Sequence, residues 1–143
     1  MSTHANTRTR VTWEPWSPAQ LLVAALGGFL TILAALVLVR GGIGEWTSPD
    51  TAVWGFRHTP LMATIELGIG LLILSAAASA VAAKSTLTGI GVFMAVFGII
   101  TLIEPDVFAR ALGVNRSMGL LYTAFGLGGF LLGTASPVIR PKA

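Results

Sequence analysis

The sequence predicts an all-α membrane protein, a bundle of four transmembrane helices built from two parallel helical-hairpin repeats with interfacial helices. Hydrophobic residues make up 54% of the 143 residues and charged residues only 10%, against roughly 25% charged in a soluble domain. An internal duplication with an offset of 56 residues supports the repeats. Four apolar stretches reach the about 17 to 25 helical residues that cross a hydrocarbon core: 18–39, 60–83, 87–103 and 118–135.

Residues 1–16 form a polar N-terminal tail that ends in Trp13 and Trp16, whose rings suit the headgroup level. Ser17 then supplies an N-cap hydroxyl, and Pro18 suits the first helical turn because its missing N–H would be unpaired there. The apolar stretch that follows exceeds the about 7 to 15 residues of a signal-peptide core, so it is expected to remain as a span. The transmembrane domain is predicted over 17–136, and a basic C-terminal tail over 137–143.

The pairing of a cap residue with a proline recurs twice. Ser48-Pro49 is interpreted as the start of a short interfacial helix over 49–56, and Thr59-Pro60 as the start of the second span. After the third span, residues 107–112 are predicted as a second interfacial helix that ends at Gly113, since glycine is the usual residue just beyond a helix.

The duplication needs no gap. It superimposes identical residues, namely Pro49 with Pro105, Asp50 with Asp106, Met62 with Met118, Gly70 with Gly126 and Leu71 with Leu127. We interpret the chain as two repeats of span, interfacial helix and span. Because each repeat crosses the membrane twice, both enter from the same side and are related by an axis along the membrane normal.

Cationic residues favour cytoplasmic N and C termini, because Lys and Arg are enriched in cytoplasmic loops. The side that carries both termini holds five cations and the other side four: Arg8, Arg10, Lys84, Arg140 and Lys142 against Arg40, Arg57, Arg110 and Arg116. These cations form no cluster of the kind that binds nucleic acid.

Small residues are expected to bring the helices together, because lipid tails give apolar helices no reason to associate. The predicted packing positions are glycines at seven-residue or GxxxG-like spacing: Gly70, Gly91, Gly98, Gly119, Gly126, Gly129 and Gly133.

Glu66 is the one charged residue within the four predicted spans. Six residues at 1.5 Å each place it about 9 Å below the start of its helix. A charge at the centre of a span costs on the order of 2.5 to 3.5 kcal/mol, so Glu66 is expected to face protein or trapped water rather than lipid.

The 56-residue offset makes Tyr122 the repeat equivalent of Glu66, and each residue lies four positions before a glycine, Gly126 or Gly70. A hydrogen bond between phenol and carboxyl would satisfy both groups where water is scarce. We therefore predict a buried polar pair of Glu66 and Tyr122. It would be a proton or solute site, or a hydrogen bond that sets the register of the two repeats; we favour the second.

Arg57 and His58 precede the second span and would approach Glu66 only if the chain folded back. We favour a cation at the membrane surface and a solvated histidine, because a haem or zinc site would need further ligands. Cysteine is absent, as are Ser-His-Asp, phosphate-loop and HExxH patterns. The sequence thus predicts no enzyme, cofactor or metal site.

Residues 59–70, with Asn115 and the segment from Tyr122 to Gly126, resemble a family of small four-helix bacterial membrane proteins, a domain of unknown function frequent in actinobacteria. That family carries Asn-Pro-Leu-His-Asn-x-x-His-x-x-x-Gly in its second span, and Asn followed by His-x-x-x-Gly in its fourth. This chain keeps Pro60, Leu61, Gly70, Asn115 and Gly126, and it has Met62, Glu66 and Tyr122 where the family has histidines. The resemblance implies an architecture in the bacterial inner (plasma) membrane and no activity.

The expected function is that of a non-enzymatic integral membrane protein, an accessory, assembly or self-associating bundle. Its partners would be the lipid bilayer and other membrane proteins or a second copy, and not nucleic acid. The alternative is a small proton- or solute-conducting transporter or channel subunit that uses Glu66.

Overall fold

The computed structural model describes residues 16–47 and 51–137. This part of the chain contains five helices and one two-stranded hairpin, which confirms the all-helical class. In order along the chain, the elements are α1 (Pro18–Gly41), β1 (Thr51–Val53), β2 (Phe56–His58), α2 (Pro60–Ala76), α3 (Ala80–Ile103), α4 (Pro105–Leu112) and α5 (Arg116–Ala135). Most of the two predicted tails lies outside the described residues.

Three of these helices, α1, α3 and α5, are each long enough and apolar enough to cross a membrane. Helix α2 is apolar as well, but at 17 residues it is shorter than the other three. By length and composition, this part of the chain supports the prediction of a multi-pass membrane protein.

The predicted boundary between the second and third spans is wrong. Helix α2 ends at Ala76 rather than at residue 83, and α3 begins at Ala80 rather than at residue 87. The turn between them is closed by the Ala77 N–H, which donates to the Leu74 carbonyl, and the Ser79 hydroxyl caps α3 by accepting the Ala82 N–H. Neither glycine nor proline marks this turn, and a single serine within a run of alanines gave no clear break in the hydropathy.

The interfacial helix predicted over 49–56 is also wrong. Pro49 and Asp50 lie outside the described residues, and the remainder pairs as an antiparallel hairpin, with Val53 opposite Phe56. At its turn, Trp54 has φ 53° and Gly55 has φ 85°, the positive angles that a two-residue hairpin loop requires. Trp54 is the one non-glycine residue of the described chain with a positive φ, and its ring stacks on Phe29 at a centroid distance of 6.5 Å.

The segment predicted as a second interfacial helix is helical. Helix α4 begins two residues earlier than expected, at Pro105, and ends at Leu112; the cap that follows is Gly113, which is left-handed with φ 67°. The Gly113 N–H donates to the Ala109 carbonyl and closes the last turn.

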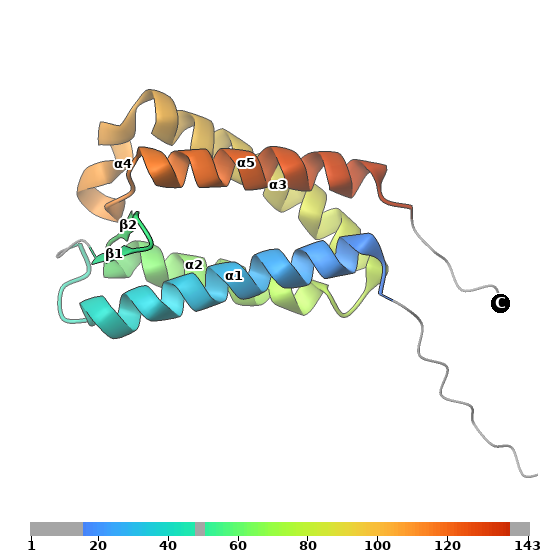
Figure 1. Cartoon of the computed structure of the whole chain (residues 1–143), viewed down its shortest axis with the longest axis horizontal. Coiled ribbons are helices and arrows are strands. Elements are labelled where there is room, and N and C mark those ends of the chain that lie inside the picture. The colour runs from blue at the N-terminus through green and yellow to red at the C-terminus, as the bar shows by residue number, and fades with distance from the viewer. Residues whose placement is uncertain (1–15, 48–50, 138–143) are drawn as a thin grey trace, which may run out of the picture.

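The long helices form two antiparallel pairs, α1 with α2 and α3 with α5 (Figure 1). The start of α1, the end of α5 and the α2–α3 turn lie at one end of the molecule, and the β-hairpin and α4 lie at the other. Few contacts join the two pairs directly.

Glycines bring the backbones of each pair into contact. A Cβ added to Gly27 or Gly70 would lie less than 3 Å from the backbone of the neighbouring helix in the first pair. The same holds in the second pair for Gly91, Gly98, Gly126 and Gly133. A Cβ added to Gly119 would lie 3.1 Å from its nearest neighbouring atom, and one added to Gly129 would lie at an ordinary contact distance of 3.4 Å. These packing positions include all the glycines expected from the sequence, together with Gly27, which had not been expected.

Candidate functional site

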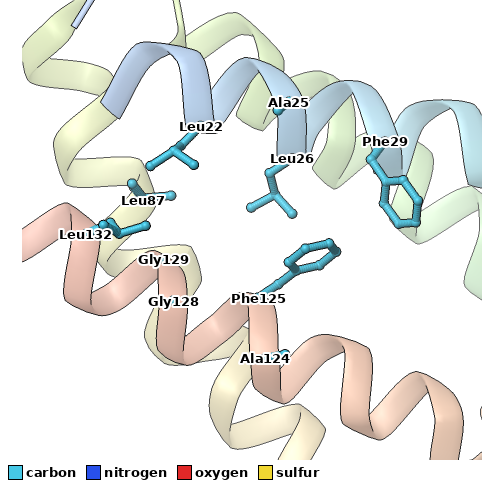
Figure 2. A pocket seen from close by; sticks show the side chains of 10 residues that line it. All are labelled: Leu22, Ala25, Leu26, Phe29, Leu87, Ala124, Phe125, Gly128, Gly129 and Leu132. Atoms are coloured by element: carbon cyan, nitrogen blue, oxygen red, sulfur yellow. The ribbon is translucent and has the colours of Figure 1, made fainter. Parts of the chain in front are cut away.

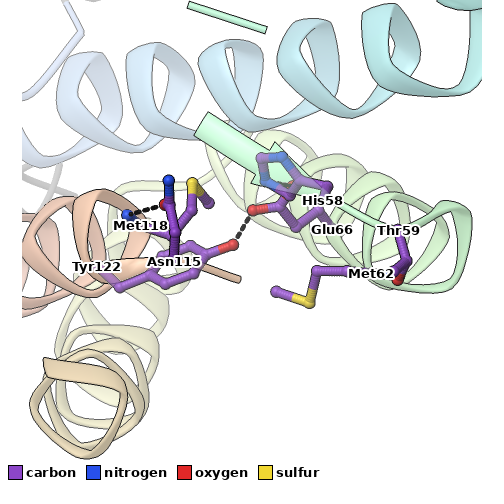
Figure 3. A network of polar contacts seen from close by, with 7 residues as sticks. All are labelled: His58, Thr59, Met62, Glu66, Asn115, Met118 and Tyr122. Carbon is purple, nitrogen blue, oxygen red and sulfur yellow. Dashed lines mark hydrogen bonds and ion pairs between the residues drawn. The ribbon is translucent and has the colours of Figure 1, made fainter. Parts of the chain in front are cut away.

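Three ionisable side chains from three elements meet inside the protein, and we call them the polar triad: His58, Glu66 and Tyr122. His58 is the last residue of β2, while Glu66 and Tyr122 each lie in the second turn of their helices, α2 and α5. Figure 3 shows the Tyr122 hydroxyl directed at the Glu66 carboxylate, with the His58 ring on the other side of that carboxylate.

Each carboxylate oxygen of Glu66 faces a different partner. The Tyr122 hydroxyl donates a hydrogen bond to Glu66 Oε1. His58 Nε2 lies 2.8 Å from Glu66 Oε2, off the axis of an aligned hydrogen bond, so the contact is an ion pair when the imidazole is protonated. The second ring nitrogen, His58 Nδ1, has no hydrogen-bond partner among the residues that the structure describes.

The polar triad is enclosed. His58, Glu66 and Tyr122 are 0%, 2% and 3% exposed. The Phe97 ring packs edge-on against Tyr122, with centroids 5.4 Å apart. Burial of an unpaired polar group costs several kcal/mol in an apolar environment. The Tyr122–Glu66 hydrogen bond and the contact of His58 with Glu66 Oε2 therefore offset part of the cost of burying these three side chains.

The backbone around His58 is held by hydrogen bonds to the end of α4. The Thr59 N–H donates to the Leu112 carbonyl at 3.0 Å, and its hydroxyl donates to the Ala111 carbonyl at 3.0 Å. The same hydroxyl accepts the Met62 N–H and so caps α2. These bonds place β2 beneath the α4–α5 connection and direct His58 inward.

The hairpin turn is tied to the start of α5 in a similar way. Asn115 caps α5 by accepting the Met118 N–H at 3.1 Å, and its amide donates to the Gly55 carbonyl at 3.3 Å. The cap residue of the helix that carries Tyr122 therefore also fixes the turn of the hairpin that carries His58.

A cavity of about 220 Å³ lies beside the polar triad, between α2 and α3. Glu66 and Tyr122 contribute to its wall together with Met62, Phe93 and Phe97, but the atoms exposed to the cavity are apolar. The polar ends of Glu66 and Tyr122 thus face each other and not the cavity.

The structure brings Glu66 and Tyr122 together, the two residues that the duplication made equivalent. The preference for a solvated His58 is wrong, because the hairpin places this residue in the core. The pattern that could have revealed it is strand alternation after a Trp-Gly turn: His58 is buried and Phe56 partly buried, while Arg57 between them is exposed.

This arrangement allows a carboxyl, an imidazole and a phenol to share protons. It also joins the three elements that carry these side chains. Within residues 16–47 and 51–137, no three His, Cys, Asp or Glu side chains come close enough together to hold a metal ion. Comparison of the chain with known protein families, with curated proteins and with solved structures finds no match.

Proposed function

We propose that the protein is a non-enzymatic, multi-pass protein of the bacterial inner membrane, with both termini in the cytoplasm, which acts through helix contacts as an accessory or assembly partner or by self-association. The observation that carries this proposal is that the polar ends of Glu66 and Tyr122 are directed at each other and away from the neighbouring cavity. The cavity beside them exposes only apolar atoms, so the polar triad is explained by a structural role in holding the two helix pairs together. The function is then expected to lie on the outer surfaces of the helices.

The extent of those surfaces supports the proposal. In each of α1, α3 and α5, about a third of the apolar stretch is buried inside the protein. The remaining side chains face lipid or another membrane helix, and exposed residues such as Ile32, Phe93 and Leu131 belong to this surface.

We further propose that α1–α2 and α3–α5 are two copies of one helical-hairpin unit, which together form a four-helix bundle. A Cβ on Gly70 would meet the Thr31 nitrogen and the Gly27 carbonyl, and a Cβ on Gly126 would meet the Ala95 nitrogen and the Gly91 carbonyl. The same offset of 56 residues relates α2 to α5 in these contacts, and one of 64 relates α1 to α3.

The helix caps follow the same offset of 56 residues, and so do two members of the polar triad, Glu66 and Tyr122. Thr59 and Asn115 both accept the N–H of a methionine three residues later. Glu66 and Tyr122, which form the hydrogen bond between the pairs, are equivalent positions. This arrangement is the one expected of two parallel repeats around an axis along the membrane normal.

Cysteine cross-linking tests the contact function. Because the sequence contains no cysteine, each introduced cysteine is the only one that can react. Single cysteines at Ile32, Phe93 and Leu131 face outward, and a cysteine at the fully buried Ala34 is the control. In native membranes we expect cross-linked species from at least one outward position and none from Ala34→Cys. The proposal is contradicted if the protein purifies from native membranes as a single copy without any other protein and if none of the cysteine positions gives a cross-link.

A second candidate function is conduction of a proton or small solute. One observation favours it: Glu66 lies beside two further protonatable groups, and its side chain contributes to the wall of the 220 Å³ cavity. Intramembrane carboxylates commonly mark proton pathways.

Glu66→Gln separates the two candidates, because it removes the charge and keeps the shape. If the protein conducts, wild-type proteoliposomes acidify faster than empty vesicles and Glu66→Gln abolishes the difference. Under the contact function, wild-type and variant vesicles acidify at the rate of empty ones, and Glu66→Gln or Tyr122→Phe weakens the cross-linked assembly.

A further inference from the structure

A second hollow lies on the other side of the molecule, between α1 and α5, with a volume of about 350 Å³. Leu22, Leu26 and Phe29 of α1 face Phe125 and Leu132 of α5 across it (Figure 2). We call this hollow the α1–α5 groove. Gly128 of α5 also belongs to its wall, and its missing side chain widens the groove.

The α1–α5 groove runs along α1, which is the direction of an acyl chain beside a spanning helix, and it is long enough for the outer part of such a chain. From Leu22 to Phe29 it follows seven residues of α1, about 10 Å along the helix axis, within the about 15 Å depth of one leaflet. Its outer end is close to the start of α1. Its inner end is closed by Phe29 and Phe125, whose rings meet edge to face with centroids 5.7 Å apart.

A cation lies at the outer end of the groove. Lys84 is three residues before Leu87, which contributes to the wall, and its ammonium donates to the Ser136 carbonyl at 2.7 Å, four residues beyond Leu132. This bond takes one of the three N–H donors of the ammonium.

The sequence segments that flank α1 and α5 at their outer ends also carry positive charge, as Lys84 does. The segments before α1 and after α5 hold four more cations in the sequence, and Glu14 is their one acidic residue. Among the described residues, the opposite end holds both signs of charge: Arg40, Arg57, Arg110 and Arg116 with Glu45, Glu104 and Asp106.

We propose that the α1–α5 groove binds an anionic phospholipid, with one acyl chain between α1 and α5 and the phosphate at Lys84. An apolar groove with a cation at its membrane-surface end matches an acyl chain that carries an anionic headgroup. The inference rests on the membrane location in the proposed function, and it goes beyond that function because it names a ligand and its site.

Native mass spectrometry of the full chain tests this site, with dimyristoyl phosphatidylglycerol and dimyristoyl phosphatidylcholine as probes. Gly128→Leu fills the groove, since an added Cβ there has no atom within 4 Å. Gly68→Leu is the matched control, because Gly68 is equally open and lies on α2 outside the groove. Lys84→Gln removes the charge and keeps a donor for the Ser136 carbonyl.

We expect the wild type and Gly68→Leu to retain one phosphatidylglycerol, with a preference of about fivefold over phosphatidylcholine. Gly128→Leu loses the bound lipid, and Lys84→Gln keeps a lipid but loses the preference. Excess inorganic phosphate does not displace the lipid, because the acyl chain holds it.

Three results overturn the proposal: equal retention of the two lipids by the wild type, undiminished phosphatidylglycerol on Gly128→Leu, or a lipid-free dimer that Gly128→Leu dissociates. The last result means that a second copy fills the groove. Cross-links from the outward cysteines are scored separately, so loss of the lipid with the cross-links intact distinguishes failure of this site from failure of the contact function.

Discussion

Glu66 is stable in the interior because two side chains from different elements face its two oxygens. Removal of one partner from a buried pair costs about 3 to 5 kcal/mol when the remaining group stays charged. Replacement of a buried ion pair by apolar residues is often neutral. The value of the polar triad therefore lies in specificity: Glu66 Oε1 gains its hydrogen bond and Glu66 Oε2 its contact with His58 only when the hairpin, α2 and α5 come together.

Tyr122→Phe removes one hydroxyl and keeps the ring that packs against Phe97. We expect the free energy of unfolding to fall by about 1 to 3 kcal/mol, because Glu66 Oε1 loses its hydrogen-bond partner at a buried position. Chemical unfolding in detergent micelles measures this change. Thr134→Val is the control, since the Thr134 hydroxyl bonds only carbonyls of its own helix, and a loss of equal size in this control contradicts the expectation.

The pairing of Glu66 with Tyr122 was predictable from the sequence because it depends on helix periodicity and on an offset within one chain. His58 was not, because its burial depends on the Trp54-Gly55 turn, which reverses the chain before α2 begins. Proline after a serine suggested a helix at that point, and tryptophan in a left-handed conformation is too rare to expect.

The two helix pairs are held by direct backbone contact at glycines, and the strength of such contact depends on the absence of a Cβ. Gly126→Ala places a methyl group against the backbone of Ala95. We expect a loss of about 1 to 3 kcal/mol or more, because neither helix can move without breaking its neighbouring contacts.

Gly128→Ala is the matched control two residues along the same helix, where an added Cβ meets nothing within 4 Å. Alanine favours a helix over glycine by about 1 kcal/mol, so this variant is expected to be as stable as the wild type or more so. Thermal unfolding followed by circular dichroism compares the two. Equal stability of the variants rules out glycine contact as the cause.

The β-hairpin positions His58 through its turn, so Gly55 is the glycine whose conformation the site requires. At φ 85° an alanine is strained although nothing crowds it, and the left-handed conformation costs about 1 to 2 kcal/mol. In Gly55→Ala we expect faster hydrogen exchange across β1 and β2. Gly44→Ala is the control, as Gly44 is equally open without a positive φ, and equal protection in Gly55→Ala contradicts the role of the turn.

Three of the four predicted spans were predictable because hydropathy and length decide them. Helix α4 was predictable because apolar residues recur at helical spacing before Gly113. Helix ends were less so. The α2–α3 turn is fixed by contacts distant in sequence, such as the bond from the Gln20 amide to the Ala77 carbonyl at 2.9 Å, and hydropathy contains no record of such a bond.

In the protein as a whole, the short helix α2 decides how the chain crosses the membrane. If α2 spans, Ala78 and Pro137 lie on one side and Glu45 and Arg110 on the other. Single cysteines at these four exposed positions, labelled from outside with a membrane-impermeant maleimide, are expected to divide into those two groups. Labelling of Ala78→Cys together with Glu45→Cys contradicts a spanning α2.

The most direct test of the account is a double-mutant cycle of Glu66→Leu and Tyr122→Phe, measured as free energies of unfolding, because leucine at 66 has no oxygen to accept the Tyr122 hydroxyl. Few contacts join the two helix pairs directly, and this hydrogen bond is one that crosses between them. The account predicts a coupling energy of about 1 kcal/mol or more between the two positions. Losses that add to within about 0.5 kcal/mol contradict it, since residues that do not interact behave in that way.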